Sequence, residues 1–122
     1  TDVSIKYVGG GVISTVEDLV KVFTALDNGI LIKPETVKTM YTTPRPGTQN
    51  GMGLGWSSSI DDKERLRVSH SGGATGFRSM LINFPEQKLV VATITNCDFY
   101  SPGGLAQQIA DIYLTAIEAG KN

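Results

Sequence analysis

The chain is poor in the residues that build metal centres, disulfide frameworks and membrane spans. Its 122 residues include one cysteine, one histidine and one tryptophan. A single cysteine excludes an internal disulfide, and one histidine without a Cys/His cluster argues against a zinc site, so we expect neither a metal nor a cofactor. No apolar run approaches the roughly 18 residues of a transmembrane helix, so no membrane partner is expected. A basic segment followed by an apolar one is also missing, so no signal peptide is expected. The sequence does not determine the cellular compartment.

Neither sign of charge is in excess. The chain carries 11 Lys and Arg against 12 Asp and Glu, a formal net charge of −1, which provides no general attraction for nucleic acid. A nucleotide site is not expected either, because no GxxxxGK[ST] sequence occurs and the glycines of segment 51–55 do not lie between a strand and a helix. With 40% hydrophobic residues, the chain has the size of one domain over residues 1–122.

The first third of the chain contains two predicted helices. The first follows Ser14, which forms a capping-box pattern with Glu17, and it stops at Asn28-Gly29. Its apolar stripe consists of Val16, Leu19, Val20, Phe23 and Leu26. The second helix begins at Pro34. Its apolar side consists of Val37, Met40 and Tyr41. The segment 42–53 is rich in glycine and proline and is predicted to be a long loop.

The remainder predicts strands followed by one more helix. Strands are expected over 53–59, 65–70, 77–84 and 88–95 as two hairpins, and the apolar run 89–92 indicates a strand covered on both faces. The last helix begins at Ser101-Pro102. Its expected apolar face comprises Leu105, Ile109, Ile112, Tyr113, Ala116 and Ile117. The order predicts an α+β fold, in which N-terminal helices and a C-terminal helix pack on an antiparallel sheet of about four strands.

The segment His70-Ser71-Gly72-Gly73 ends the second expected strand and is the main candidate for chemistry. Neighbouring residues on a strand point to opposite faces, so His70 and Ser71 cannot act together as base and nucleophile. The plainer alternatives are a half-buried structural histidine and an ordinary turn at the two glycines. Arg78 could face a carboxylate of a ligand or be a surface arginine.

Four sequence patterns in this order resemble the C-terminal part of the serine β-lactamase and penicillin-binding-protein superfamily. The branch that the chain resembles is that of class C β-lactamases, DD-peptidases and esterases, and the resemblance extends from Gly9 to about Gly120. The patterns are Gly9-Gly10-Gly11-Val12-Ile13-Ser14-Thr15 with Glu17-Asp18-Leu19, Gly53-Leu54-Gly55-Trp56, His70-Ser71-Gly72-Gly73 with Gly76-Phe77, and Val90-Val91-Ala92 with Thr95-Asn96.

The resemblance implies roles for residues of the third pattern. His70-Ser71-Gly72 takes the place of the family's Lys-Thr-Gly strand, with histidine instead of lysine. Ser71 would then hydrogen-bond the substrate, and His70 would polarise the site or hold the general-base network. The backbone N–H of Gly73 would be one of two oxyanion donors, each typically worth about 3 kcal/mol.

Further substrate-binding positions are expected with less detail. Gly72 and Arg78 are counted with Ser71 as substrate-binding residues, Arg78 for a carboxylate of the ligand, and the resemblance adds Asn96 from the segment 96–101. That segment and the loop 42–51 would border the substrate groove.

The family's nucleophile and base are missing from this sequence. None of the nine serines is followed three residues later by lysine, and no tyrosine heads a Tyr-x-Asn sequence. We therefore expect a C-terminal fragment of a larger serine-hydrolase domain that is inactive alone. It would act on a β-lactam, peptide or ester only with a complementary N-terminal half.

In the family that the chain resembles, the strand matching 88–95 pairs with N-terminal strands that this sequence lacks. The resemblance therefore implies an open edge on this strand, and open edges recruit partners. We therefore expect a homo-oligomer, a swapped dimer or association with an N-terminal fragment. Two alternatives remain at this level. One is a non-catalytic binding or oligomerisation module that retains part of the fold, and the other is an unrelated α+β domain.

Overall fold

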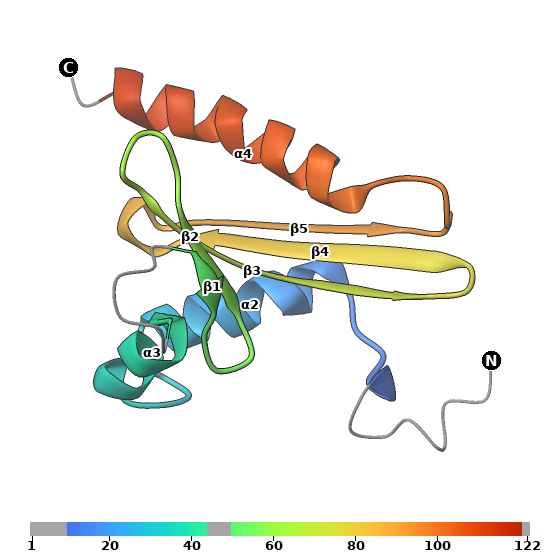
Figure 1. Ribbon diagram of the computed structural model, residues 1–122, viewed down its shortest axis with the longest axis horizontal. Helices are drawn as coiled ribbons and strands as arrows, with labels where there is room; N and C mark the ends of the chain where they lie inside the picture. Colours follow the sequence, from blue (N-terminus) through green and yellow to red (C-terminus); the bar gives the residue numbers. More distant parts are fainter. Residues whose placement is uncertain (1–9, 44–49, 121–122) are drawn as a thin grey trace.

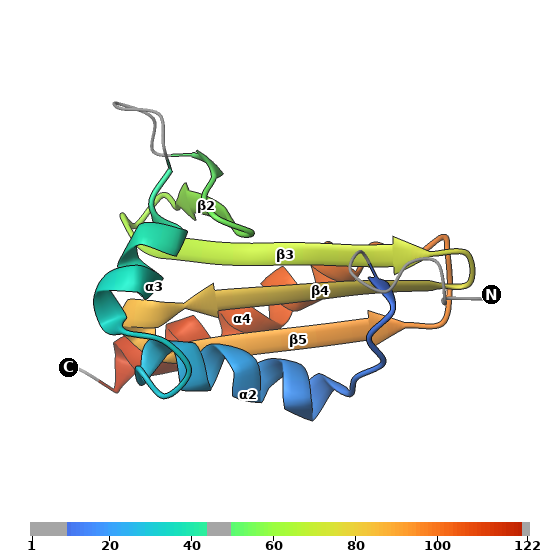
Figure 2. The same ribbon diagram turned by 90° about the horizontal axis from the view of Figure 1, so that it is seen from below.

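Helices cover both faces of a single antiparallel sheet. The computed structural model describes residues 10–43 and 50–120. The sheet has five strands in the order β1-β2-β3-β4-β5, so each strand pairs with its neighbour in the chain. Helices α2 (Val16–Asp27) and α3 (Pro34–Tyr41) lie on one side of the sheet, and α4 (Pro102–Ala119) lies on the other (Figure 1, Figure 2). The expected α+β class with an antiparallel sheet is confirmed.

The described strands number five, one more than the roughly four expected, and all but 77–84 differ from the expected bounds. They are β1 (Gly51–Met52), β2 (Ser57–Ile60), β3 (Leu66–Ala74), β4 (Phe77–Phe84) and β5 (Leu89–Thr95), with a 3₁₀ turn at Pro85–Gln87. The two hairpins β2–β3 and β4–β5 are confirmed. Strand β3 continues to Ala74, so the expected end at His70 is wrong, and Gly72-Gly73 lie within the strand rather than in a turn.

A turn replaces the first part of the expected strand 53–59. The N–H of Gly53 donates to the carbonyl of Trp56 at 2.7 Å, and Gly55 has φ +81°, a conformation that favours glycine. Leu54 N–H donates to the Met40 carbonyl at 3.0 Å. This turn is therefore tied to α3 and leaves only Ser57–Ile60 to form β2. The expected loop 42–53 lies partly outside the described residues.

Side chains of the sheet alternate between two apolar clusters. On the α2 side, Val68 and Leu81 pack with Phe23 and Tyr41. On the α4 side, the cluster consists of Ile82, Phe84, Val91, Ala106, Ala110 and Leu114. Val90 and Ala92 of β5 pack on the α2 side while Val91 packs on the α4 side. The prediction of a strand covered on both faces is thus confirmed.

Helix α2 begins one residue later than expected. Thr15, rather than Ser14, is the N-cap, and its hydroxyl accepts the backbone N–H of Asp18 at 3.2 Å. Both residue types cap well, so the sequence could not distinguish the two registers. The stop at Asn28-Gly29 is confirmed, with Gly29 at φ +67°.

Helix α4 turns a different face to the sheet from the one expected. Ala106, Ala110 and Leu114 are buried, whereas Ile112 and Tyr113 are 69% and 57% exposed. The expected large-residue face is therefore wrong. Alanines at i and i+4 bring the helix axis close to the sheet, and Ile109 packs at the margin.

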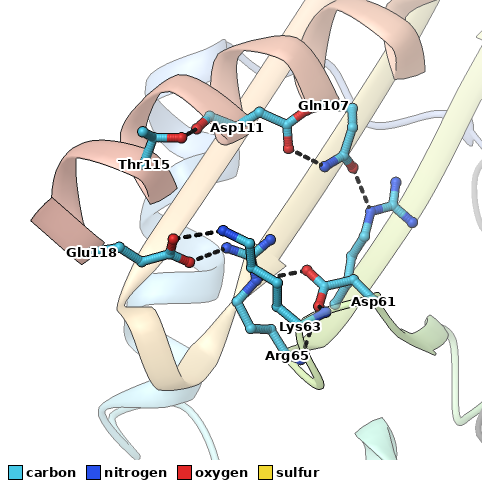
Figure 3. A network of polar contacts seen from close by, with 8 residues as sticks. Asp61, Lys63, Arg65, Gln107, Asp111, Thr115 and Glu118 are labelled. Carbon is cyan, nitrogen blue, oxygen red and sulfur yellow. Dashed lines mark hydrogen bonds and ion pairs between the residues drawn. The ribbon is translucent and has the colours of Figure 1, made fainter.

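A charged network joins the end of α4 to the β2–β3 turn (Figure 3). Arg65 Nε donates to Asp61 Oδ2 at 2.7 Å, and its Nη1 donates to Glu118 Oε1 at 2.9 Å. Lys63 Nζ reaches the other oxygen of Glu118 at 2.6 Å. The Arg65 side chain is only 15% exposed and lies over the Phe84 ring, so it is held by packing as well as by charge.

Candidate functional site

The end of β3 is open on one side. Strand β2 pairs with β3 only from Leu66 to Ser69, whereas β4 continues to pair with it as far as Ala74. Residues 70–74 therefore have a partner strand on one edge only, among the residues that the structure describes. The sequence His70-Ser71-Gly72-Gly73 lies in this half-paired stretch, and all four residues are exposed.

The register places these residues on alternate faces. His70 is opposite Leu81, which packs on the α2 side, and Ser71 is opposite Met80, which packs on the α4 side. His70 and Gly72 therefore share one face and Ser71 and Gly73 the other. His70 and Ser71 thus lie on opposite faces of the sheet, as expected, and their side chains are separated by the strand.

Trp56 connects His70 to the core. The Trp56 and His70 rings are edge to face, with centroids 6.0 Å apart and planes at 89°, and the Phe23 centroid is 4.5 Å from that of Trp56. Trp56 is partly buried and packs against the α2-side cluster, and its ring also contacts His70. The two rings and Leu19, Gly72 and Ser79 border a cavity of about 180 Å³.

The two glycines leave room for side chains of β4. A Cβ on Gly72 would lie 2.7 Å from Ser79 Oγ, and a Cβ on Gly73 would lie 2.9 Å from Arg78 Cδ. Ser79 Oγ donates to the Gly72 carbonyl at 3.3 Å. The glycines thus allow β4 side chains to lie directly against the β3 backbone.

The β3–β4 turn orients the Gly73 amide. Only Thr75 and Gly76 separate the strands, and Gly76 has φ +90°, as required at the third position of a type II turn. In such a turn Ala74 and Phe77 form the hydrogen-bonded pair, and pairs alternate along an antiparallel ladder. Gly73 therefore belongs to a pair without ladder hydrogen bonds, and its N–H points toward the open edge.

Arg78 is engaged by an acidic residue that sequence reasoning did not single out. Its Nη1 lies 2.8 Å from Asp98 Oδ1 and also donates to the carbonyls of Ala74 and Phe77. The other oxygen of Asp98 accepts the Gly76 N–H at 2.9 Å. The structure places Arg78 on the face of Gly73, opposite to that of His70. Asp98 lies in the expected site segment 96–101, but nothing in the sequence marked its pairing with Arg78.

A second cavity lies beside this face. It has a volume of about 540 Å³ and is bordered by Ser71, Gly73, Arg78 and the start of α4 at Ser101 to Gly103. Asn96 is exposed just after β5, one residue beyond Thr95, which is directly opposite Arg78. The sheet end therefore gathers Ser71, Gly72, Gly73 and Arg78 around one cavity, whereas Asn96 is not among the residues that line it.

The arrangement provides hydrogen-bond donors and an imidazole around an open strand edge. Such a strand can bind a carbonyl compound and stabilise developing negative charge on oxygen. Within residues 10–43 and 50–120, no cluster of three or more His, Cys, Asp or Glu residues could hold a metal ion. No helix in the same ranges has the length and apolar character to cross a membrane.

Comparison with known proteins identifies the fold and the family. The family described as Beta-lactamase matches residues 2–114. The human serine beta-lactamase-like protein LACTB, mitochondrial, is 32% identical over 123 residues, covering 78% of this chain and 22% of that protein. The mouse protein of the same name is 32% identical over 114 residues, covering 70% of this chain and 20% of that protein.

A solved structure shares the arrangement of strands and helices. The octameric penicillin-binding protein homologue from Pyrococcus abyssi superposes with a TM-score of 0.74 at 24% sequence identity, over 84% of this chain and 24% of that chain. The chain thus spans about a fifth of the length of the relatives it matches and about a quarter of the solved chain. From the family match and the two 32% identical relatives, we conclude that the chain belongs to the Beta-lactamase family.

Proposed function

We propose that this chain is the C-terminal portion of a β-lactamase-like serine hydrolase and supplies its substrate- and oxyanion-binding strand. The observation that carries the proposal is the open edge of β3, toward which the Gly73 N–H points beside the exposed His70. The sequence contains no Ser-x-x-Lys, so the nucleophile and its lysine would come from a complementary N-terminal part. Alone, the chain would be inactive.

The proposed reaction is acyl transfer through a serine acyl-enzyme. Attack of the serine on a substrate carbonyl places negative charge on the carbonyl oxygen, which the Gly73 N–H would stabilise together with the N–H of the nucleophile. Ser71 would hydrogen-bond the substrate on the Gly73 face, and His70 would hold the general-base network on the other. The open side of the strand gives the substrate access to both faces.

The substrates that fit are β-lactams, peptides and small esters, each of which presents a carbonyl to a serine. Gly72 would allow close approach of the substrate to the backbone. Asn96 would contact it from the end of β5. A substrate carboxylate would have to share Arg78 with Asp98, whose carboxylate lies 2.8 Å from Nη1.

The proposed partner binds along β5. This strand ends the described sheet. Beside it, a groove of about 620 Å³ is bordered by residues of α2, β5 and α4. Its apolar lining includes Val20, Val90, Ile109 and Tyr113. An added strand would satisfy the open edge and cover this groove, so an N-terminal half or a second copy fits here.

The alternative is a non-catalytic oligomerisation module that retains part of the fold. The same open edge of β5 favours it, and the matched penicillin-binding protein homologue is described as octameric. The alternative predicts self-association without any turnover when an N-terminal part is added.

One substitution pair tests the oxyanion role of Gly73. Gly73→Pro removes the N–H without removing a ladder hydrogen bond, whereas Gly73→Ala adds a Cβ and keeps the N–H. The Cβ meets the flexible side chain of Arg78 in both variants. With the N-terminal part present, kcat of Gly73→Pro should be about 100-fold or more below that of Gly73→Ala.

The measurement uses a chromogenic β-lactam and a chromogenic ester. The chain alone should turn over neither, and adding the polypeptide encoded upstream of Thr1, if it contains Ser-x-x-Lys, should produce turnover. Equal kcat for the two Gly73 variants would contradict the oxyanion role. Turnover by the chain alone would contradict the proposed division of the active site.

A further inference from the structure

We infer that Ser79 is a positioning residue for the Gly72–Gly73 peptide. The inference rests on the proposed function, since it gives Ser79 a part in orienting the Gly73 N–H. Sequence reasoning assigned no role to this serine. It lies on β4 directly opposite Gly72.

Two observations place the Ser79 hydroxyl against the Gly72–Gly73 peptide. Its Oγ donates to the Gly72 carbonyl oxygen at 3.3 Å. A Cβ on Gly72 would be 2.7 Å from the same Oγ, so only glycine leaves room for this hydroxyl without a shift. The close approach and the absence of a side chain at residue 72 are therefore parts of one arrangement.

The hydrogen bond acts on the Gly73 N–H because both groups belong to one amide. The carbonyl oxygen of Gly72 and the nitrogen of Gly73 share a planar, conjugated unit, so fixing the carbonyl also fixes the direction of the N–H. A donor on the carbonyl oxygen draws electron density from the nitrogen and makes its N–H a stronger donor. Ser79 would thus orient and strengthen the oxyanion donor from the opposite end of the peptide.

The location of Ser79 supports this role over a purely structural one. The side chain is partly exposed rather than buried, so the hydroxyl is not needed to satisfy a core group. It borders the cavity of about 180 Å³ that is also bordered by His70 and Trp56. The carbonyl has two lone pairs and can accept the hydroxyl in addition to a ladder N–H.

The first test reads the peptide itself and requires no activity. In Ser79→Ala, the Gly72 carbonyl carbon and the Gly73 amide nitrogen should both shift upfield in NMR spectra of the chain. Ser79→Thr keeps the hydroxyl and should leave both resonances near their original positions. Thr39→Ala is the control, because Thr39 Oγ1 makes the same kind of bond to the Glu35 carbonyl in α3. Unchanged Gly72 and Gly73 resonances in Ser79→Ala would overturn the inference.

The second test reads catalysis in the complex with the N-terminal part. Ser79→Ala should lower kcat about fivefold with little change in KM, as expected for one neutral hydrogen bond that matters in the transition state. Ser79→Thr should restore kcat, and Thr39→Ala should leave it unchanged. An unchanged kcat in Ser79→Ala would overturn the positioning role. If the unaltered complex has no activity, the proposed function fails, and the resonances alone decide whether Ser79 orients the peptide.

Discussion

At the scale of single residues, one carboxylate holds together groups from three elements. Asp27 at the end of α2 accepts the Tyr41 hydroxyl at 3.0 Å and the Asn83 side-chain amide at 2.8 Å. Asn83 is fully buried on β4. Burial raises the pKa of Tyr41, and the neighbouring charge of Asp27 raises it further, so the phenol stays protonated and donates. Nothing in the sequence indicated that Asp27, Tyr41 and Asn83 form one group.

Removing the carboxylate should therefore be costly. Asp27→Ala leaves the buried Asn83 amide without its acceptor, and we expect a loss of about 2–3 kcal/mol in the free energy of unfolding. Urea denaturation followed by circular dichroism measures it. Asp62→Ala, in the exposed turn, is the control and should change stability by less than about 0.5 kcal/mol. Equal effects of the two substitutions would contradict the role of Asp27.

At the scale of elements, α4 is attached to the sheet by small apolar residues along its length and by charges near its end. Ala106 and Ala110 are completely buried against the strands. Hydrogen bonding to Lys63 lowers the pKa of Glu118. Burial alone would raise the pKa of Asp61, but hydrogen bonds from Arg65 and the Lys63 backbone outweigh it and lower that pKa. The β2–β3 turn and α4 are thus coupled through ionised carboxylates.

The coupling predicts a loss of stability in acid. A carboxyl group whose pKa is lower in the folded chain contributes stability above its unfolded pKa and loses it as the pH falls through the folded value. The free energy of unfolding should therefore decrease below about pH 4.5, the ordinary value for Glu118.

Glu118→Gln tests this coupling at two pH values. At pH 7 the variant should be less stable than the unaltered chain in urea denaturation, and at pH 2–3 the two should converge. Glu35→Gln, at an exposed position of α3, removes the same charge. Its difference in stability from the unaltered chain should not depend on pH in this way. A pH-independent difference for Glu118→Gln would contradict the ionic origin of the coupling.

At the scale of the whole molecule, two open stretches of the described sheet serve different purposes in the proposed function. The end of β3 would receive substrate, and the outer edge of β5 would receive another strand. Ile94 on β5 is 44% exposed, and it lies in register with Ser79 and Gly72. The two stretches are therefore connected through β4 within one sheet.

The edge of β5 predicts self-association of the isolated chain. Light scattering at micromolar concentration should show dimers or larger species, and Ile94→Lys should shift them toward monomer, because a charge on an edge strand opposes pairing. Ile112→Lys is the matched control, since Ile112 is 69% exposed on α4 and is not among the residues that border the groove beside β5. A strictly monomeric chain, or equal effects of both lysines, would contradict association through β5.

The local sequence pattern was sufficient to predict most helices and strands, because helix stops, hairpin turns and alternating strands depend on neighbouring residues in the sequence. It specified the stop of α2 at Asn28-Gly29, the bounds of β4 and the apolar run of β5. It also indicated the family through four ordered patterns, and it showed that the sequence contains no Ser-x-x-Lys. The candidate site segment His70 to Gly73 was visible at this level for the same reason.

Tertiary structure decided what depends on contacts between distant segments. The face that α4 buries follows from the fit of Ala106 and Ala110 to the sheet, which large-residue periodicity could not predict. The continuation of β3 to Ala74 follows from its pairing with β4, and the Asp98 contact with Arg78 follows from the approach of the segment after β5. The sequence by itself determined which residues are available for the site. Only the packing of strands decided that Ser79 meets Gly72 and that the Gly73 N–H points toward the open edge of β3.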